Sequence, residues 1–330
     1  MIKERNYYFD NAKSILIFLV VLGHFIEPIV YINNTCEGIF LFIYLFHMPA
    51  FIFISGYFSN FQLNIKQIFK LIKKFLIPYI VVQIAFVIFT NILGVRDYRL
   101  TLKTPYYIYW YIFAMFVWNL VMKLILKTNI NLKYIILISI IVGVLSGYNT
   151  NIGVEWSLSR ILIFFPFFVL GYYFKTNKIE ISNIINKKRA LIILLVLILL
   201  LIYKNINSSW LYCNTSFVNM GVSGYQAAIK RVIVYLGEVL SMICFFSIVP
   251  REKTLYTYIG ENTFFIYLAH GFIVKWLLYT GFYKNFTQNN TLFKLFTLIV
   301  SSLLVVIVFS INMKYIKNKT CKQFQYKKYK

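Results

Sequence analysis

The chain has 330 residues, of which 60% are hydrophobic, 20% are aromatic and only 13% are charged. This composition excludes an ordinary soluble globular domain and indicates a polytopic membrane protein. The formal net charge of +24 would suggest nucleic-acid binding in a soluble protein, but here the basic residues lie in short segments between apolar runs. In that position they determine membrane topology, so nucleic acid is not an expected partner.

Cysteine and histidine usage gives little support to a metal site. The four cysteines show no C-x-x-C spacing and the chain has only three histidines, so we expect no structural metal. A disulfide between Cys36 and Cys213 would need both residues on an oxidising side, and we do not expect it. The first apolar run is long enough to span a bilayer and has no small-residue cleavage site, so we expect it to stay as the first membrane helix.

Runs of roughly 17 to 23 apolar residues are typical of membrane-spanning helices. In chain order they cover residues 14–33, 39–59, 75–93, 106–126, 132–148, 158–174, 190–206, 228–249, 262–281 and 292–313. The sequence therefore predicts an all-α integral membrane protein with about ten transmembrane helices. We expect a cytoplasmic N-terminal tail over residues 1–13, a single transmembrane domain over residues 14–313 and a basic cytoplasmic tail over residues 314–330.

The density of lysine and arginine alternates from loop to loop. Basic residues gather in the N-terminal tail, which holds Lys3 and Arg5, in the loops after the second, fourth and sixth predicted helices, and after the tenth. The intervening segments NNTCEG and GYNTNIGVEW contain none. By the positive-inside rule both termini are cytoplasmic. The segment GVRDYRLTLKTP departs from this pattern, because it places basic residues on the outer side.

The first predicted helix carries Lys13 and His24, eleven residues apart. At about 100° per residue they share a helix face roughly 16 Å apart, and Asp10 falls near the same line if the helix extends that far. A rim cation with a titratable base three turns deeper suits a long ligand with an anionic head and a reactive end, such as acyl-coenzyme A. Neutral histidine accepts a proton readily near pH 7, so His24 is a candidate general base; the structural alternative is a histidine satisfied by a neighbouring helix.

The other two histidines fall at similar predicted depths. His47 lies about 12 Å from the outer end of the second helix, and Pro49 followed by Ser55 and Gly56 favours a kinked, closely packed helix. His270 lies about 12 Å from the cytoplasmic end of the ninth helix. Ionisable residues inside membrane segments are usually functional, so three histidines at one depth predict a polar cavity at the middle of the membrane.

Three further charges and one aromatic segment lie within apolar runs. Two interpretations are open for Glu27 and Arg160: they pair with each other as a structural ion pair, or they bind sugar hydroxyls. The structural ion pair is slightly favoured over sugar binding. Glu238 is an intramembrane carboxylate whose partner the sequence does not identify. In the segment YYIYWYIFAMFVW, Trp110 and its neighbouring tyrosines are candidates for stacking on a sugar. An aromatic belt at the membrane interface is the commoner explanation for such a segment.

Four segments occur in order along the chain: YFDNAKSILIFLVVLGHF, FHMPAFIFISGYF, SRILIFFPFFVLGYYF and GENTFFIYLAHG. Together they resemble the family-3 membrane acyltransferases, in particular the branch similar to fucose 4-O-acetylases, over residues 5–313. The family hallmark, an Arg or Lys followed by ten residues and a His, is matched by Lys13 and His24. A basic motif that is often Arg-x-x-Arg corresponds to KLIKKFLIPY, where Lys70 and Lys73 replace the arginines, so bidentate phosphate recognition is lost.

The resemblance implies an O-acyltransferase that moves acetyl groups from cytosolic acetyl-coenzyme A to hydroxyls of cell-surface glycans, with His24 as the base and Lys13 in the donor site. Further candidates are Asp10, His47 and His270 for catalysis, Lys70, Lys73 and Lys74 for donor binding, and Glu27, Ser55, Trp110 and Arg160 for substrate binding. The expected partners are a polysaccharide or lipid-linked sugar acceptor and membrane lipids. The expected location is a plasma membrane, and the composition is typical of an AT-rich bacterial genome. The sequence leaves the oligomeric state open.

Two other functions are consistent with a polar path through the membrane. A glycan or lipid transporter would also use intramembrane ionisable residues, but would move its ligand without coenzyme A. No repeat of 20 to 50 residues is visible, so an inverted-repeat transporter gains no support from the sequence. A membrane scaffold for a polysaccharide assembly complex is the third hypothesis, and it predicts that His24→Ala leaves the phenotype unchanged.

Overall fold

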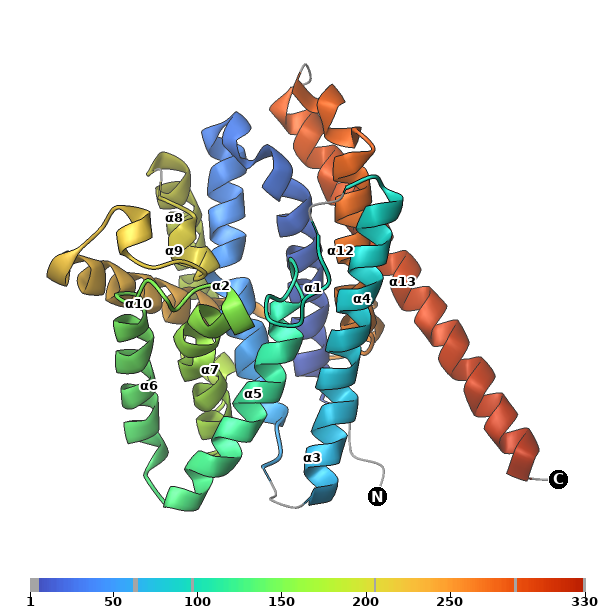
Figure 1. Cartoon of the computed structure of the whole chain (residues 1–330), viewed down its shortest axis with the longest axis horizontal. Coiled ribbons are helices and arrows are strands. Elements are labelled where there is room, and N and C mark those ends of the chain that lie inside the picture. Colours follow the sequence, from blue (N-terminus) through green and yellow to red (C-terminus); the bar gives the residue numbers. More distant parts are fainter. Residues whose placement is uncertain (1–5, 62–64, 96–97, 205, 288–289, 329–330) are drawn as a thin grey trace. The chain divides into compact units, whose positions relative to one another are not determined.

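The computed structural model describes residues 6–61, 65–95, 98–204, 206–287 and 290–328. Within these ranges every regular element is a helix (Figure 1). Seven helices are long and apolar enough to cross a membrane, judged by length and composition. The prediction of an all-α integral membrane protein is therefore confirmed. Lys3, Arg5 and the side chains of the predicted tail over residues 314–330 lie outside the described residues.

Each of the ten predicted spans contains a long helix. These helices are α1 (Tyr7–Ile26), α2 (Asn34–Phe58), α4 (Ile77–Ile92), α5 (Trp110–Ile125), α6 (Leu132–Ser146), α7 (Leu158–Thr176), α8 (Lys187–Tyr203), α10 (Gly224–Ile248), α12 (Thr263–Tyr279) and α13 (Thr291–Lys328). The crossing of the bilayer by all ten stays a prediction. The shorter elements are η1 (Glu27–Ile32), α3 (Ile65–Leu71), η2 (Ile72–Leu76), η3 (Leu126–Thr128), η4 (Glu155–Ser157), η5 (Ile181–Asn183), α9 (Ser209–Tyr212), η6 (Val218–Met220), α11 (Thr257–Gly260) and η7 (Phe282–Thr287).

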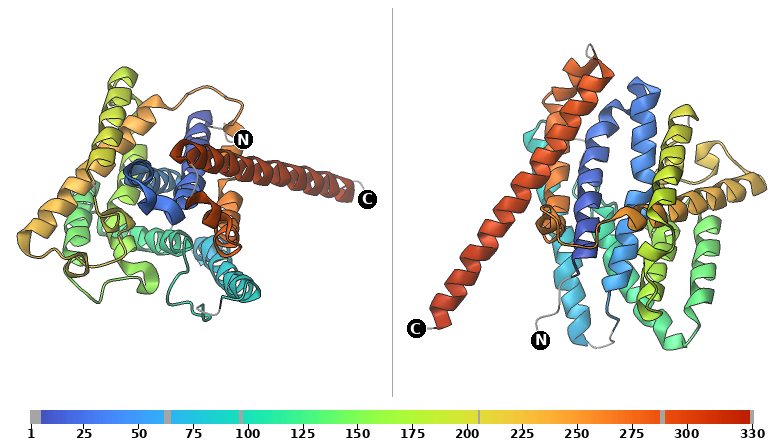
Figure 2. Two further views of the ribbon diagram at one scale, coloured as in Figure 1. Left: turned by 90° about the horizontal axis from the view of Figure 1, so that it is seen from above. Right: turned by 180° about the vertical axis from the view of Figure 1, so that it is seen from behind.

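Two helix ends differ from their predicted positions. α1 begins at Tyr7, earlier than the expected edge at residue 14, because Asn6 caps it by accepting a hydrogen bond from the Phe9 amide. Asp10 and Lys13 are therefore helical residues and not part of an N-terminal tail. α13 continues past residue 313 to Lys328 as one helix, beyond the ends of α1 and α12 (Figure 2). Lysine is a good helix former, so a helix can continue into a basic segment after its apolar run has ended.

The chain divides into two units, one of residues 1–40 with 249–330 and the other of residues 41–248. In the first unit α1 packs against α11, α12 and α13, and η1 continues α1 with Pro28 in its first turn. Most buried residues of α1 are apolar, and the side chains of Asn11 and Ser14 add hydrogen bonds to this packing. α1 is thus the helix around which the first unit is organised.

The second unit contains α2 beyond Phe40 and the helices from α3 to α10. α3, the π-helical turn η2 and α4 follow one another directly, and α5 packs against η2, α4 and α7. α6 packs along α7, whereas α10 lies across the direction of both helices and contacts α6 and α8 (Figures 1 and 2). The thiols of Cys36, Cys213 and Cys244 are free and buried.

Two glycines allow α2 and α7 to touch at the backbone. A Cβ atom on Gly56 would lie 2.0 Å from the carbonyl oxygen of Phe168, and one on Gly171 would lie 2.0 Å from that of Phe53. Only glycine permits this distance, and small residues are the usual means by which membrane helices approach closely. The prediction of close packing at Gly56 is confirmed. α2 continues through Pro49 to Phe58, so the proline does not end the helix.

A fully buried asparagine fastens α1 to the segment before α12. Asn11 Nδ2 donates to the carbonyl oxygens of Pro250, at 2.9 Å, and Glu252, at 2.7 Å. Its Oδ1 accepts from the hydroxyls of Thr254, at 3.0 Å, and Thr257, at 2.6 Å. An amide can donate twice and accept twice, so Asn11 is fully satisfied. This network fixes the N-terminal half of α1 in the first unit.

We predict that Asn11→Asp destabilises the protein by about 2 to 4 kcal/mol, because an oxygen would face two carbonyl oxygens and a charge would be buried. The measurement is the thermal unfolding midpoint of purified protein in detergent. Asn91→Asp is the matched control, since Asn91 is an exposed residue of α4. Equal midpoints for the two variants would show that the Asn11 network does not stabilise the first unit.

Candidate functional site

His24 lies in the last turn of α1 and contacts the carboxylate that follows it. Its Nδ1 is 3.0 Å from Oε2 of Glu27, and the two side chains are 14% and 28% exposed. An ionised carboxylate only accepts hydrogen bonds, so Nδ1 of His24 carries the proton and donates it. The lone pair of the neutral ring is then on Nε2, which is the ring atom that can accept a proton. The geometry is that of a histidine base oriented by a carboxylate.

His270 on α12 lies beside His24 within the first unit. The two ring centroids are 5.5 Å apart and the ring planes differ by 34°. Nδ1 of His270 donates to the carbonyl oxygen of Ile266 at 3.1 Å, which leaves Nε2 as the acceptor atom. That Nε2 is buried and has no hydrogen-bond partner among the described residues. The structure therefore brings together two of the three histidines that were expected at one depth.

Two residues near Glu27 were missed by the sequence analysis. Lys275, five residues after His270 on α12, interacts electrostatically with the Glu27 carboxylate. Tyr283 in η7 is also close to it, and burial, followed by the charge of Glu27, raises the pKa of Tyr283 well above its usual value. Glu27 and Arg160 were selected because they are charged residues within apolar runs. Lys275 lies inside the predicted span 262–281, so the same criterion would have selected it. The site at the end of α1 thus contains both signs of charge.

His47 on α2 belongs to the second unit. Its Nδ1 donates to the carbonyl oxygen of Ile43 at 2.7 Å, and the edge of its ring meets Tyr44 with the centroids 4.8 Å apart. The side chain is buried. His47 is therefore held in the same way as His270, by a carbonyl one helical turn earlier, and its catalytic role stays a prediction.

Lys13 lies on α1 near its beginning, paired with Asp10. The Nζ atom of Lys13 is 2.7 Å from Oδ1 of Asp10, and the carboxylate is more buried than the amine. α1 is helical throughout from Tyr7 to Ile26, so the helical geometry assumed for the Lys13 to His24 spacing is the observed one. Asp10 is about 21 Å along the axis from His24. The structure thus places Asp10 with the donor-site candidate Lys13, and its catalytic role stays a prediction.

The three lysines after the second predicted helix lie on α3 and η2 in the second unit. Lys70, Lys73 and Lys74 are all exposed, and the amine of Lys74 lies 4.9 Å from the centroid of the Phe75 ring. Lys73 and Lys74 belong to the π-helical turn, a feature that is frequent at functional sites. These residues form an exposed basic stretch, which can attract phosphate as separate point charges.

Three substrate-binding candidates lie close together in the second unit. The guanidinium group of Arg160 on α7 lies over the Trp110 ring, 5.1 Å from its centroid, and Nε donates to the carbonyl oxygen of Tyr212 at 2.9 Å. The hydroxyl of Ser55 on α2 is 2.6 Å from that of Tyr111, whose ring adjoins Trp110. In the first unit Glu27 contacts His24. The pairing of Glu27 with Arg160 stays a prediction.

The family described as "Acyltransferase domain" matches residues 6–311, which is most of the chain. The chain belongs to this acyltransferase family. The resemblance inferred from the four sequence motifs is therefore confirmed, and the chain is a multi-pass membrane member of the family. Membership in an acyltransferase family favours an enzyme over the transporter and scaffold alternatives.

Two curated relatives share part of this domain. Nodulation protein NolL of Sinorhizobium fredii is 28% identical over 206 residues, which are 58% of this chain and 54% of NolL. Nodulation protein NolL of Mesorhizobium japonicum is 43% identical over 60 residues, which are 17% of this chain and 16% of that protein. The chain thus spans about half the length of the first relative and less of the second. No solved structure matches the chain.

Proposed function

We propose that the protein is a membrane O-acetyltransferase of a bacterial plasma membrane. It would move an acetyl group from acetyl-coenzyme A to a hydroxyl of a cell-surface polysaccharide or of its lipid-linked precursor. The observation that carries the proposal is His24 held by Glu27 at 3.0 Å, with the ring of His270 beside it, in a chain of an acyltransferase family. A base of this kind is what the attack of an alcohol on a thioester requires.

In the proposed reaction the acceptor hydroxyl gives its proton to Nε2 of His24 while its oxygen bonds to the carbonyl carbon of the thioester. Glu27 accepts the hydrogen bond of Nδ1 and stabilises the imidazolium that forms. The tetrahedral intermediate then collapses, the carbon–sulfur bond breaks, and the imidazolium returns the proton to sulfur. The products are an acetyl ester and coenzyme A as the free thiol, so atoms and protons balance.

His270 adds a second imidazole to the proposed reaction centre. Its Nε2 is an acceptor atom in an interior position, with no partner in the described part of the chain. It can receive a hydrogen bond from another hydroxyl of the acceptor and so orient the one that attacks. Temporary transfer of the acetyl group to a histidine nitrogen, before transfer to the hydroxyl, is a variant of the same mechanism.

The proposed contacts of the donor are basic groups. An ammonium group has three N–H donors and Asp10 requires only one, so Lys13 can bind a phosphate oxygen while it stays fixed by Asp10. The separation of Lys13 and His24, roughly 16 Å along α1, suits an extended carrier with its phosphates at one end and its thioester at the other. Lys70, Lys73 and Lys74 are further proposed phosphate contacts, and their exposure supports that role.

The proposed contacts of the acceptor combine aromatic and polar groups. Trp110 with the Arg160 guanidinium over its ring, the Ser55 hydroxyl and the Glu27 carboxylate are groups that hydrogen-bond or pack against sugars. Glu27 would then have two roles, because its carboxylate also orients His24. No metal takes part in the proposed reaction.

We predict that His24→Ala lowers the rate of acetyl transfer by about 100- to 10,000-fold, the usual contribution of a general base. Glu27→Gln should lower it by at least about tenfold, because the hydrogen bond to Nδ1 loses its charge. The measurement uses purified protein, radiolabelled acetyl-coenzyme A and envelope polysaccharide from a strain without the gene.

The matched control is Glu180→Gln, which changes an exposed carboxylate bonded to Asn183 and should leave the rate unaltered. Transfer by His24→Ala at the wild-type rate would rule out His24 as the base. If the wild type itself neither transfers acetyl groups nor releases coenzyme A, the acetyltransferase proposal is wrong.

A further inference from the structure

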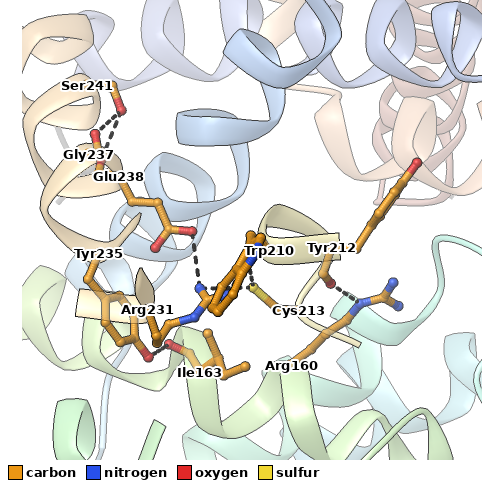
Figure 3. Close-up of polar contacts among 10 residues, drawn as sticks. All are labelled: Arg160, Ile163, Trp210, Tyr212, Cys213, Arg231, Tyr235, Gly237, Glu238 and Ser241. Atoms are coloured by element: carbon orange, nitrogen blue, oxygen red, sulfur yellow. Dashed lines mark hydrogen bonds and ion pairs between the residues drawn. The ribbon is translucent and has the colours of Figure 1, made fainter. Parts of the chain in front are cut away.

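A buried pair of opposite charges lies on α10 in the second unit, and the proposed acyl transfer does not use it. Arg231 and Glu238 are 1% and 0% exposed, two helical turns apart, with Nη1 and Oε1 separated by 3.9 Å (Figure 3). This distance is too long for a hydrogen bond. Within the described residues neither carboxylate oxygen of Glu238, nor Nε of Arg231, has a hydrogen-bond partner. The pair therefore has unused hydrogen-bonding capacity in the protein interior.

The position of Arg231 is fixed by other contacts. Nη1 lies 3.4 Å from the sulfur of Cys213, and Nη2 donates to the carbonyl oxygen of Trp210. The guanidinium carbon lies 5.5 Å from the centroids of both the Trp210 and the Tyr235 rings, and the Tyr235 hydroxyl is itself held by the carbonyl of Ile163 at 2.7 Å. Arg231 can close the gap to Glu238 only by giving up these contacts.

The gap has the geometry and the charge of a hydroxyl site. A purely structural pair of arginine and carboxylate would be direct, at about 2.7 to 2.9 Å. An oxygen about 2.8 Å from each group bridges two atoms that are 3.9 Å apart. A hydroxyl accepts from Arg231 and donates to Glu238, whereas an anion would be repelled by Glu238 and a cation by Arg231.

The neighbouring groups support a neutral ligand. Burial raises the pKa of the Cys213 thiol to about 11, against an opposing effect of Arg231, so the thiol is uncharged near pH 7. Arg160, also near this cluster, is engaged by the Tyr212 carbonyl and the Trp110 ring. The neutral thiol therefore adds no charge beside the gap between Arg231 and Glu238.

The segment that covers the pair is a loop between two membrane helices. Trp210 belongs to α9 and Cys213 directly follows it. α9 is a single turn that lies outside all the predicted spans. The alternation of basic residues places this stretch on the outer side of the membrane. A surface glycan or its lipid-linked precursor would be presented from that side.

We propose that Arg231 and Glu238 form a recognition site for a hydroxyl group of a neutral sugar, which is a part of the acceptor distinct from the hydroxyl that becomes acetylated. The inference rests on the proposed function only in naming that sugar as the acceptor. It also gives Glu238, for which the sequence identified no partner, a specific role. A trapped water molecule would satisfy the same two groups, so the experiment must distinguish a sugar from water.

The test uses purified full-length protein in detergent with the methyl glycosides of glucose, galactose, mannose, fucose and rhamnose. We expect at least one glycoside to raise the thermal midpoint of the wild type, and Glu238→Gln to abolish that shift. For the same glycoside, KM as acetyl acceptor should rise roughly 10- to 100-fold, the loss expected for a hydrogen bond to a charged group. Release of coenzyme A to water should stay unchanged.

Two further variants make the result decisive. Glu155→Gln is the matched control, because Glu155 pairs with Lys103 on the surface of the same unit, and it should keep the glycoside shift. Arg231→Lys keeps the positive charge but loses the planar fork, and it replaces Glu238→Gln if that variant does not purify as a folded protein.

The outcomes separate this proposal from the acetyltransferase proposal. A glycoside shift that survives in Glu238→Gln and Arg231→Lys overturns the recognition site, even if acetyl transfer is normal. Absence of a shift with any glycoside in the wild type also overturns it, since the gap would then hold water alone. A shift that depends on Glu238 in a protein that does not consume acetyl-coenzyme A supports the site and contradicts the transferase.

Discussion

Polar groups in an apolar helical protein have to find their hydrogen-bond partners inside the chain, and this constraint determines what each polar side chain can do. Asn11 uses all four of its hydrogen-bonding positions to join α1 to the segment before α12. Its role is therefore structural. His24 and His270 instead use Nδ1 for internal contacts, with Glu27 and with the Ile266 carbonyl, which makes Nε2 the acceptor atom of each neutral ring.

The same criterion can be applied to the other charge pairs. Lys13 and Asp10 form a direct pair at 2.7 Å near one end of α1. Arg231 and Glu238 are more deeply buried and yet remain 3.9 Å apart, with both carboxylate oxygens unsatisfied in the described part of the chain. Because an unsatisfied buried carboxylate costs free energy, it is retained only where a ligand or water offsets that cost. A charge pair that stays open inside the protein is thus a stronger indication of a ligand than one that closes.

Sequence patterns were sufficient for the all-α fold, and they named several residues that the structure brings together. Apolar length located all ten long helices, because that property is itself what selects a membrane helix. It misplaced the start of α1, since the polar first turn at Asp10, Asn11 and Lys13 lowers hydropathy while the Asn6 cap maintains the helix. The depth argument expected His24 and His270 at one level, and the structure places their rings side by side.

Contacts of charged side chains were harder to predict. Glu27 was considered as a partner of Arg160 or as a sugar-binding residue, and its contact with His24, three residues away on the same helix face, was not considered. Arg231 was overlooked as the partner of Glu238, although seven residues on a helix return to the same face. Lys275 was not recognised near Glu27, because helix-to-helix proximity depends on packing that a single sequence does not show. Local periodicity was informative, and tertiary pairing required the structure.

The measurement that tests the central claim most directly is the acetyl content of surface polysaccharide, by proton NMR, in the organism that carries this gene. A deletion strain is complemented with wild type, His24→Ala or Lys13→Ala, with protein levels matched. We predict that the acetyl signals disappear on deletion, return with the wild type, stay absent with His24→Ala and return only in part with Lys13→Ala. Unchanged acetylation in all strains, with reduced polymer export, would contradict the account and favour a transporter.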